Sequence, residues 1–268
     1  MISFGLAQTT VHGVIKDSLS GEPIPFASIG ISGKPLGTLS TDIGKFEFTF
    51  DDRLSKDSIK VAAIGYKQLT FSVKEFSGIR NGTIYLKATP MELEEVTVKA
   101  KKIKYDILGS KNFTKNNCSG FVKNSANWKG SEAAILAGNK EGRLVRLESF
   151  GFYVIQNKYA DSLMFRLMFY EASPKKYPRL KTILKKPVIF KLGIKQGEFV
   201  LDLKDYNIIT SKDFFISLEC LMDEMDISKF CYAGSYSTPS FVKSSAFDRW
   251  YKIRGGGGDF NVKVSYTR

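Results

Sequence analysis

The chain has 268 residues, of which 43% are hydrophobic and 25% are charged, and its formal net charge is +13. This length suits two domains, and the composition excludes a chain that is disordered throughout. No run of 18 apolar residues occurs, which excludes a membrane-spanning helix. Residues 1–100 contain 11 basic and 11 acidic residues, so the whole positive excess lies beyond them. This change in charge predicts a domain boundary near residue 100.

Residues 1–8 have the character of the end of a secretory signal peptide. They are mostly apolar, with small residues at Gly5 and Ala7 that suit a cleavage site. An ordinary frayed N-terminus is the alternative interpretation. We expect an exported protein, located in the periplasm, on the outer-membrane surface or outside the cell.

Residues 9–90 are predicted to form a seven-stranded β-sandwich of the transthyretin or immunoglobulin type. Short segments rich in β-branched and aromatic residues alternate with turns, as in Lys45–Phe50, where apolar and polar residues alternate with period two. The cluster Asp17–Pro23 and the Asp42–Gly44 pair are typical turn sequences. No segment has helical periodicity of helix length, which favours an all-β sandwich.

This region resembles the carboxypeptidase regulatory-like family over about residues 10–88. The resemblance depends on several turn and core positions that occur in the expected order, at 13–17, 21–29, 37–46 and 64–66. It implies a transthyretin-like β-sandwich of the kind found in envelope proteins of Bacteroidetes. In that family the domain is usually an accessory module without catalytic residues, so the resemblance implies a fold and no site.

Residues 91–104 are predicted to be a linker or strand, and residues 105–268 a second, basic β-sandwich, jelly-roll-like in form. The strands expected there are separated by turn signals such as Lys195–Gly197. This region resembles only uncharacterised proteins. The expected strands are Leu144–Val154, Leu163–Tyr170, Val188–Ile194, Glu198–Leu203, Phe214–Leu221 and Asn261–Tyr266.

Three cysteines are too few for a disulfide-built scaffold. Cys220 and Cys231 flank a short acidic segment and could form a disulfide across a hairpin, which would leave Cys118 free. Three unpaired buried thiols are the alternative, because an exported protein permits either state.

The residues that catalysis and metal binding require are scarce. The single histidine, His12, lies in the first predicted strand, where a sheet residue is expected rather than a catalytic base. One histidine and three scattered cysteines do not make a zinc site, and no cofactor is expected. An enzyme would need paired carboxylates in the C-terminal domain, for example Asp202 and Glu219.

Two further motifs are read as structural. The acidic loop of Asp223, Glu224 and Asp226 could bind Ca²⁺ but matches no known calcium loop, so a solvated hairpin tip is expected. Residues 255–258 are four glycines that lack the Lys-Ser/Thr and helix of a phosphate loop, and we expect a flexible loop.

A basic segment between Ala172 and Gly197 has no acidic residue. It could contact an anionic glycan, lipopolysaccharide or nucleic acid through salt-sensitive contacts, although a solvated loop and sheet edge is the alternative. Nucleic acid is not expected as the partner of an exported protein. The candidate polyanion-binding residues are Lys175, Lys176, Arg179, Lys181, Lys185 and Lys186.

The sequence therefore predicts a non-catalytic envelope or secreted binding or structural protein. The first sandwich would be accessory, and the second would present a surface to a glycan or another envelope component. Aromatic residues such as Trp128, Trp250 and Tyr251 could stack on sugar rings, although tryptophan also suits a core. The alternatives are a carbohydrate-active enzyme with paired carboxylates, and a scaffold subunit of an envelope complex, which would expose an apolar surface or a strand edge.

Overall fold

In the residues that it describes, the computed structural model is nearly all β, with one short α-helix, α1 (Val73–Ser77). The predicted signal-peptide remnant and most of the predicted linker lie outside the described residues. No helix in the described part of the chain is long and apolar enough to cross a membrane. The structure describes residues 8–79, 81–90, 102–123, 128–139, 142–235, 239–254 and 257–267.

The N-terminal sandwich has seven strands in two sheets. One sheet has the order β4-β1-β7 and the other the order β3-β2-β5-β6. Strand β1 pairs antiparallel with β4 and parallel with β7. The strands are β1 (Gln8–Asp17), β2 (Ser28–Ile31), β3 (Gly37–Leu39), β4 (Lys45–Asp51), β5 (Ser58–Ala62), β6 (Leu69–Ser72) and β7 (Gly82–Leu86).

Alternation along β4 builds the core of this sandwich. Phe46, Phe48 and Phe50 are buried, while the residues between them face outward. All three rings lie about 6 Å from the ring of Phe76, at 6.0, 6.1 and 6.2 Å between centroids. Phe76 belongs to α1, which begins at a capping box between Ser72 and Glu75. The short helix therefore closes the apolar face that β4 presents.

The C-terminal sandwich also has two sheets. One has the order β13-β12-β17-β10-β19-β20, with β14 also paired to β12, and the other has the order β21-β18-β11-β22-β8, with β9, β15 and β16 attached. The chain crosses repeatedly between them, and every strand pair is antiparallel. The strands are β8 (Ile103–Gly109), β9 (Cys118–Ser119), β10 (Glu132–Ala137), β11 (Val145–Asn157), β12 (Leu163–Ala172), β13 (Pro178–Thr182), β14 (Val188–Leu192), β15 (Gly197–Asp202), β16 (Ile209–Thr210), β17 (Phe214–Cys220), β18 (Phe230–Ser235), β19 (Ser240–Lys243), β20 (Tyr251–Ile253), β21 (Gly257–Gly258) and β22 (Phe260–Thr267).

An aromatic core joins the two C-terminal sheets. Phe165 of β12 lies 5.4 Å from Phe230 of β18, measured between ring centroids, and 5.9 Å from Phe190 of β14. Tyr232 of β18 lies 5.2 Å from Phe260 of β22. Aromatic side chains bury large apolar areas and stabilise one another in tilted and edge-to-face pairs. The predicted all-β class with two β-sandwiches is confirmed.

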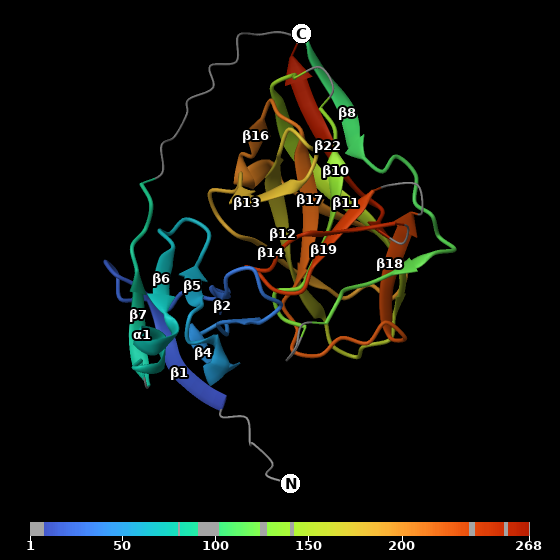
Figure 1. The fold of residues 1–268 in the computed structure, drawn as a ribbon. Helices are drawn as coiled ribbons and strands as arrows, with labels where there is room; N and C mark the ends of the chain where they lie inside the picture. Colours follow the sequence, from blue (N-terminus) through green and yellow to red (C-terminus); the bar gives the residue numbers. More distant parts are fainter. Residues whose placement is uncertain are drawn as a thin grey trace.

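The two sandwiches lie side by side and are hydrogen-bonded to each other (Figure 1). Arg166 of β12 donates from Nη1 to the carbonyl oxygen of Phe26 at 2.7 Å. The amide of Gly33 donates to the carbonyl of Phe247 at 2.8 Å, and the Ser245 hydroxyl lies 3.2 Å from the Lys34 carbonyl oxygen. The loops around β2 therefore meet the sheet that contains β12 and β19.

The disulfide differs from the predicted one. Cys118 of β9 is bonded to Cys231 of β18, and their Cα atoms are 5.5 Å apart. The prediction that Cys220 pairs with Cys231 is wrong because Cys231 is bonded to Cys118, and β17 and β18 do not form the hairpin that was expected. Cys220 is instead a buried free thiol. Strand β9 pairs directly with β18, which brings Cys118 within bonding distance.

Candidate functional site

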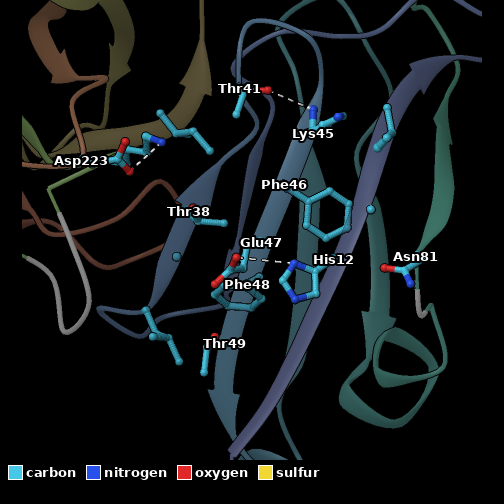
Figure 2. Close-up of a pocket in the computed structure, with 16 residues that line it drawn as sticks. His12, Thr38, Thr41, Lys45, Phe46, Glu47, Phe48, Thr49, Asn81 and Asp223 are labelled. Carbon is cyan, nitrogen blue, oxygen red and sulfur yellow. Dashed lines mark hydrogen bonds and ion pairs between the residues drawn. The ribbon is translucent and has the colours of Figure 1, made fainter.

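A groove of about 670 Å³ lies on the N-terminal sandwich, beside a loop pair of the C-terminal one (Figure 2). Strands β1, β3 and β4 form most of its lining. The C-terminal sandwich contributes Lys129 and Asp223, which form an ion pair at 2.7 Å between Nζ and Oδ1. The groove is thus bounded by both halves of the protein.

Backbone groups of β4 are available along this groove. Among the described strands β4 pairs only with β1, so its other edge is open. The Gly44 carbonyl accepts from Ile15 of β1, whereas the Lys45 amide and carbonyl contact Thr41 on the open side. Successive residues of a strand direct their backbone groups to opposite edges. The N–H and C=O groups of Glu47 and Thr49 therefore point toward the groove edge.

The side chains on the outer face of the groove are polar and balanced in charge. His12 of β1 lies opposite Glu47 of β4, with 3.5 Å between Nδ1 and Oε2, and both side chains are more than half exposed. Figure 2 shows this pair beside Thr49, whose hydroxyl lies 2.9 Å from that of Thr10. The expectation that His12 is a sheet residue agrees with this position.

A second feature is a row of four buried charged residues on the sheet that faces the N-terminal sandwich. Strand register places Arg166 beside Glu219, Glu219 beside Glu132, and Glu132 beside Lys243, across β12, β17, β10 and β19. All four side chains are at most 5% exposed. We call these residues the buried charge row.

The charges of this row are paired at both ends. The Arg166 guanidinium forms a bidentate ion pair with Glu219. Lys243 Nζ lies 2.8 Å from Oε1 of Glu132. Tyr170 donates to the same Oε1 at 2.9 Å, and Ser217 donates to Oε2 at 2.8 Å. Burial raises the pKa of Glu132 above its ordinary value, against the lowering effect of Lys243.

Sequence reasoning missed the buried charge row. Its four residues are far apart in the chain and meet only through strand register. A charged residue within an apolar segment, such as Glu132 before Ala133 or Lys243 after Val242, was the available signal. Glu219 had been named only as half of a carboxylate pair with Asp202. That pair is not formed, because Asp202 lies on β15 of the other sheet, beside Lys204.

The predicted polyanion-binding residues lie on β13 and the loops next to it, and several contact acceptors within the protein. Lys176 pairs with Asp213, and Lys181 lies 3.1 Å from Glu171. Lys186 donates to the carbonyl oxygen of Asp205 at 2.7 Å. These acceptors come from outside the basic segment, so its charge is less concentrated than the sequence indicated. Lys175, Arg179 and Lys185 are exposed, and binding by this segment stays a prediction.

The remaining candidate motifs have structural positions. No cluster of potential metal ligands occurs among the described residues, and Asp223 of the acidic loop is paired with Lys129. Gly257 and Gly258 form β21 and pair with β18, so the predicted flexible loop is wrong for this part of the glycine run. Trp128 and Trp250 pack against the core, whereas Tyr251 is 48% exposed.

A third feature is a groove of about 540 Å³ on the outer face of the sheet that contains β11, β15 and β22. Its floor is Gly151, where a Cβ atom would lie 2.8 Å from Oδ1 of Asn261. Lys263 lies over the ring of Tyr105 at 4.7 Å, and Lys115 lies over the ring of Tyr153 at the same distance. The lining combines hydrogen-bonding groups with the ring of Phe113, while the two tyrosine rings lie beside the groove against its lysines.

Two solved structures show distant likenesses to this chain. The cysteine protease and lectin-like domains of Cwp84, a surface layer associated protein of Clostridium difficile, align with 8% identity and a TM-score of 0.37, over 91% of this chain and 59% of that one. The infectious bursal disease virus Gx strain structure aligns with 9% identity and a TM-score of 0.26, over 98% and 61%. This chain therefore spans about three fifths of the aligned structures. No curated protein matches the sequence.

A family model does match the N-terminal sandwich. The model described as the CarboxypepD_reg-like domain covers residues 11–98, which include every strand from β2 to β7 and most of β1. The two-sheet sandwich observed there agrees with the transthyretin-like fold that the sequence resemblance implied. Such a domain is a non-catalytic module. Residues 11–98 of this chain are therefore a carboxypeptidase regulatory-like domain.

Proposed function

We propose that this protein is an exported, non-catalytic binding and structural component of the cell envelope, and that its groove along β4 binds an extended segment of a partner protein. The observation that carries the proposal is the open edge of β4, which lines a groove of about 670 Å³. Open strand edges are templates for an added strand, and main-chain hydrogen bonds then supply the affinity.

The chemistry of the groove favours a peptide over a polyanion. Lys129 is paired with the Asp223 carboxylate, and the Glu47 carboxylate adds a negative charge beside His12. A peptide strand offers both donors and acceptors to the N–H and C=O groups of Glu47 and Thr49. Phe46 and Phe48 are buried, so the groove offers no exposed aromatic platform for sugar rings.

Export is supported by the disulfide between Cys118 and Cys231. Disulfides persist in oxidising compartments such as the periplasm and the cell exterior and are rare in the cytosol. Fractionation of the host cells tests this part of the proposal. Recovery of the protein from the cytosol with reduced cysteines would contradict it.

The groove is tested with a library of displayed random peptides, selected on the full chain. We expect extended peptides to be enriched. Glu47→Pro should lower the affinity for these peptides at least about tenfold, which corresponds to about 1.4 kcal/mol of binding free energy. Proline removes the Glu47 N–H, which points away from β1, so the sheet itself keeps its pairing.

Glu47→Gln is the matched control, because it removes the charge and keeps the N–H. It should bind the selected peptides within about twofold of the wild type. Equal loss of affinity in both variants would indicate that the peptides recognise the Glu47 carboxylate. Failure to enrich any peptide would refute the proposal. Circular dichroism of each variant establishes that it is folded.

Glycan recognition is a second candidate, favoured by the groove over Gly151. That groove is lined by the half-buried ring of Phe113 together with hydrogen-bonding groups, a combination that suits sugar binding. An array of neutral and sulfated glycans and lipopolysaccharide, probed at low and moderate salt, tests it. Loss of binding in Phe113→Ala would assign the ligand to this groove. Loss in Lys185→Glu with Lys186→Glu would assign it to the basic segment.

A further inference from the structure

The pair formed by Lys243 and Glu132 has the surroundings of a reactive site rather than those of an ordinary ion pair. Both side chains are at most 2% exposed, and Nζ of Lys243 lies 2.8 Å from Oε1 of Glu132. Because Oε1 is bonded to the carboxyl carbon, the amine is close to the atom that it would attack. The amine also lies 5.1 Å from the ring centre of Tyr170 and 4.8 Å from that of Trp250. An amine and a carboxyl group are thus held together in a buried site, where the amine also donates to the Ala246 carbonyl at 3.0 Å.

We propose that Lys243 and Glu132 condense to form an intramolecular amide bond that covalently joins β19 to β10. The proposal is independent of the peptide groove, because it concerns different residues. It assigns a self-modification to this chain, and its only by-product is one water molecule.

The condensation begins with a proton transfer within the pair. When the Lys243 ammonium passes a proton to the Glu132 carboxylate, two buried charges become a neutral amine and a neutral acid. Burial helps the carboxyl group to take up this proton, because desolvation penalises its charged form and raises the pKa of Glu132. The amine then has the free electron pair that an ammonium lacks, and the acid has a more electrophilic carbon than a carboxylate.

Two hydroxyl groups are placed to assist the attack. As Nζ bonds to the carboxyl carbon, the electron pair of the C=O bond moves to Oε2, which accepts a hydrogen bond from Ser217 at 2.8 Å. Such donors stabilise the charge that develops on an oxyanion. Oε1, which accepts from Tyr170 at 2.9 Å, carries the transferred proton and becomes the leaving hydroxyl.

The intermediate collapses with the loss of water. A second proton passes from the nitrogen to Oε1, for which the Tyr170 hydroxyl, 3.4 Å from Nζ, is a relay. The C–O bond breaks, C=O re-forms at Oε2, and an amide remains. The water can leave into the adjoining cavity of about 150 Å³, which Glu132, Tyr170 and Lys243 all line.

The energetic balance favours the amide at this position. A buried ion pair carries a desolvation cost that its own attraction does not always offset, whereas an amide is neutral. Preorganised reacting groups gain effective molarities of about 10⁵–10⁸ M, which outweighs the reverse reaction with water. Arg166 and Glu219 provide a control within the same row, because a guanidinium stays protonated and is no nucleophile.

The experiment is mass spectrometry of the full chain, unfolded and fully reduced. We expect the mass to be lower than that of the sequence by one water, and a protease digest to yield a branched peptide that joins the segments containing Glu132 and Lys243. Lys243→Met and Glu132→Ala should restore the full mass. Lys252→Met, which removes an exposed lysine of the neighbouring strand β20, should keep the deficit.

The wild-type protein alone can overturn the proposal, so it does not depend on whether the variants fold. A wild-type mass that equals the sequence mass, after prolonged incubation at neutral and mildly acidic pH, would show an ion pair only. A loss of water that fragmentation maps to other residues would also refute it.

Discussion

Cys220 is a thiol that the fold shields from reaction. It lies on β17 with no exposed surface, and burial raises the pKa of its thiol to about 12. The thiolate is the reactive form, so Cys220 should be inert at neutral pH in the folded protein. We expect no alkylation of the native protein and one alkyl group per chain after unfolding without reductant. Labelling of the native chain, counted by mass spectrometry, would contradict this shielding.

Asp106 of β8 is a site where stability should depend on pH. Its carboxylate lies 2.9 Å from Nη2 of Arg143, and this hydrogen bond lowers the pKa of Asp106 below its ordinary value. A lowered pKa contributes stability above the unfolded pKa, near pH 4, and that contribution is lost as the pH falls through the folded pKa. Asp106→Asn should therefore cost about 0.5 kcal/mol at pH 7, since the pair is partly exposed. Urea unfolding at pH 7 and near pH 2 tests this, and a difference that persists in acid would indicate another cause.

At the scale of elements, the disulfide ties a two-residue strand to the sheet. Cys118 of β9 and Cys231 of β18 are 113 residues apart in the sequence, so their disulfide closes a long loop. Cross-linking distant residues restricts the unfolded chain, and a native disulfide contributes about 2–5 kcal/mol. Cys118→Ala with Cys231→Ala should lose that amount in urea unfolding. Reductant should destabilise the wild type by a similar amount and leave the double variant unchanged.

Element prediction depended on two signals, which are the alternation of apolar and polar residues and runs of large apolar residues. Strands β4 and β15 alternate between buried and exposed residues, and the sequence pattern shows it. Strand β17 was predicted although every residue in it is buried, because large apolar residues dominate its sequence. Strands β10, β18 and β19 are equally buried but were missed, since their sequences have neither alternation nor a long run of large apolar residues. Small residues such as Ala133 and Gly234 further weaken the pattern.

The sites were harder to predict than the fold for a related reason. The groove along β4 exists because a strand edge is left open, and the partners of a strand are set by the whole chain. The buried charge row depends on register across four strands, and a shift of one residue would move each side chain to the other face. The wrong cysteine pair has the same origin, since sequence proximity suggested a hairpin where the structure has two sheets.

At the scale of the whole molecule, Arg166 joins the two sandwiches. It neutralises Glu219 within the C-terminal sandwich and donates to the Phe26 carbonyl of the N-terminal one. Arg166→Met should cost about 3–5 kcal/mol, because it leaves a buried carboxylate without a counter-charge. Arg146→Met removes an exposed arginine of the same sandwich and should change stability by less than about 0.5 kcal/mol.

A second variant separates the two roles of Arg166. In Arg166→Met with Glu219→Leu both charges are gone, so most of the lost stability should return. The bond to Phe26 is still absent, so the contact between the sandwiches should remain loosened. Hydrogen exchange at the Gly33 amide, which donates to the Phe247 carbonyl across the interface, reports this contact. We expect Gly33 to exchange faster in both variants; wild-type protection in the double variant would mean that Arg166 stabilises one sandwich without holding the two together.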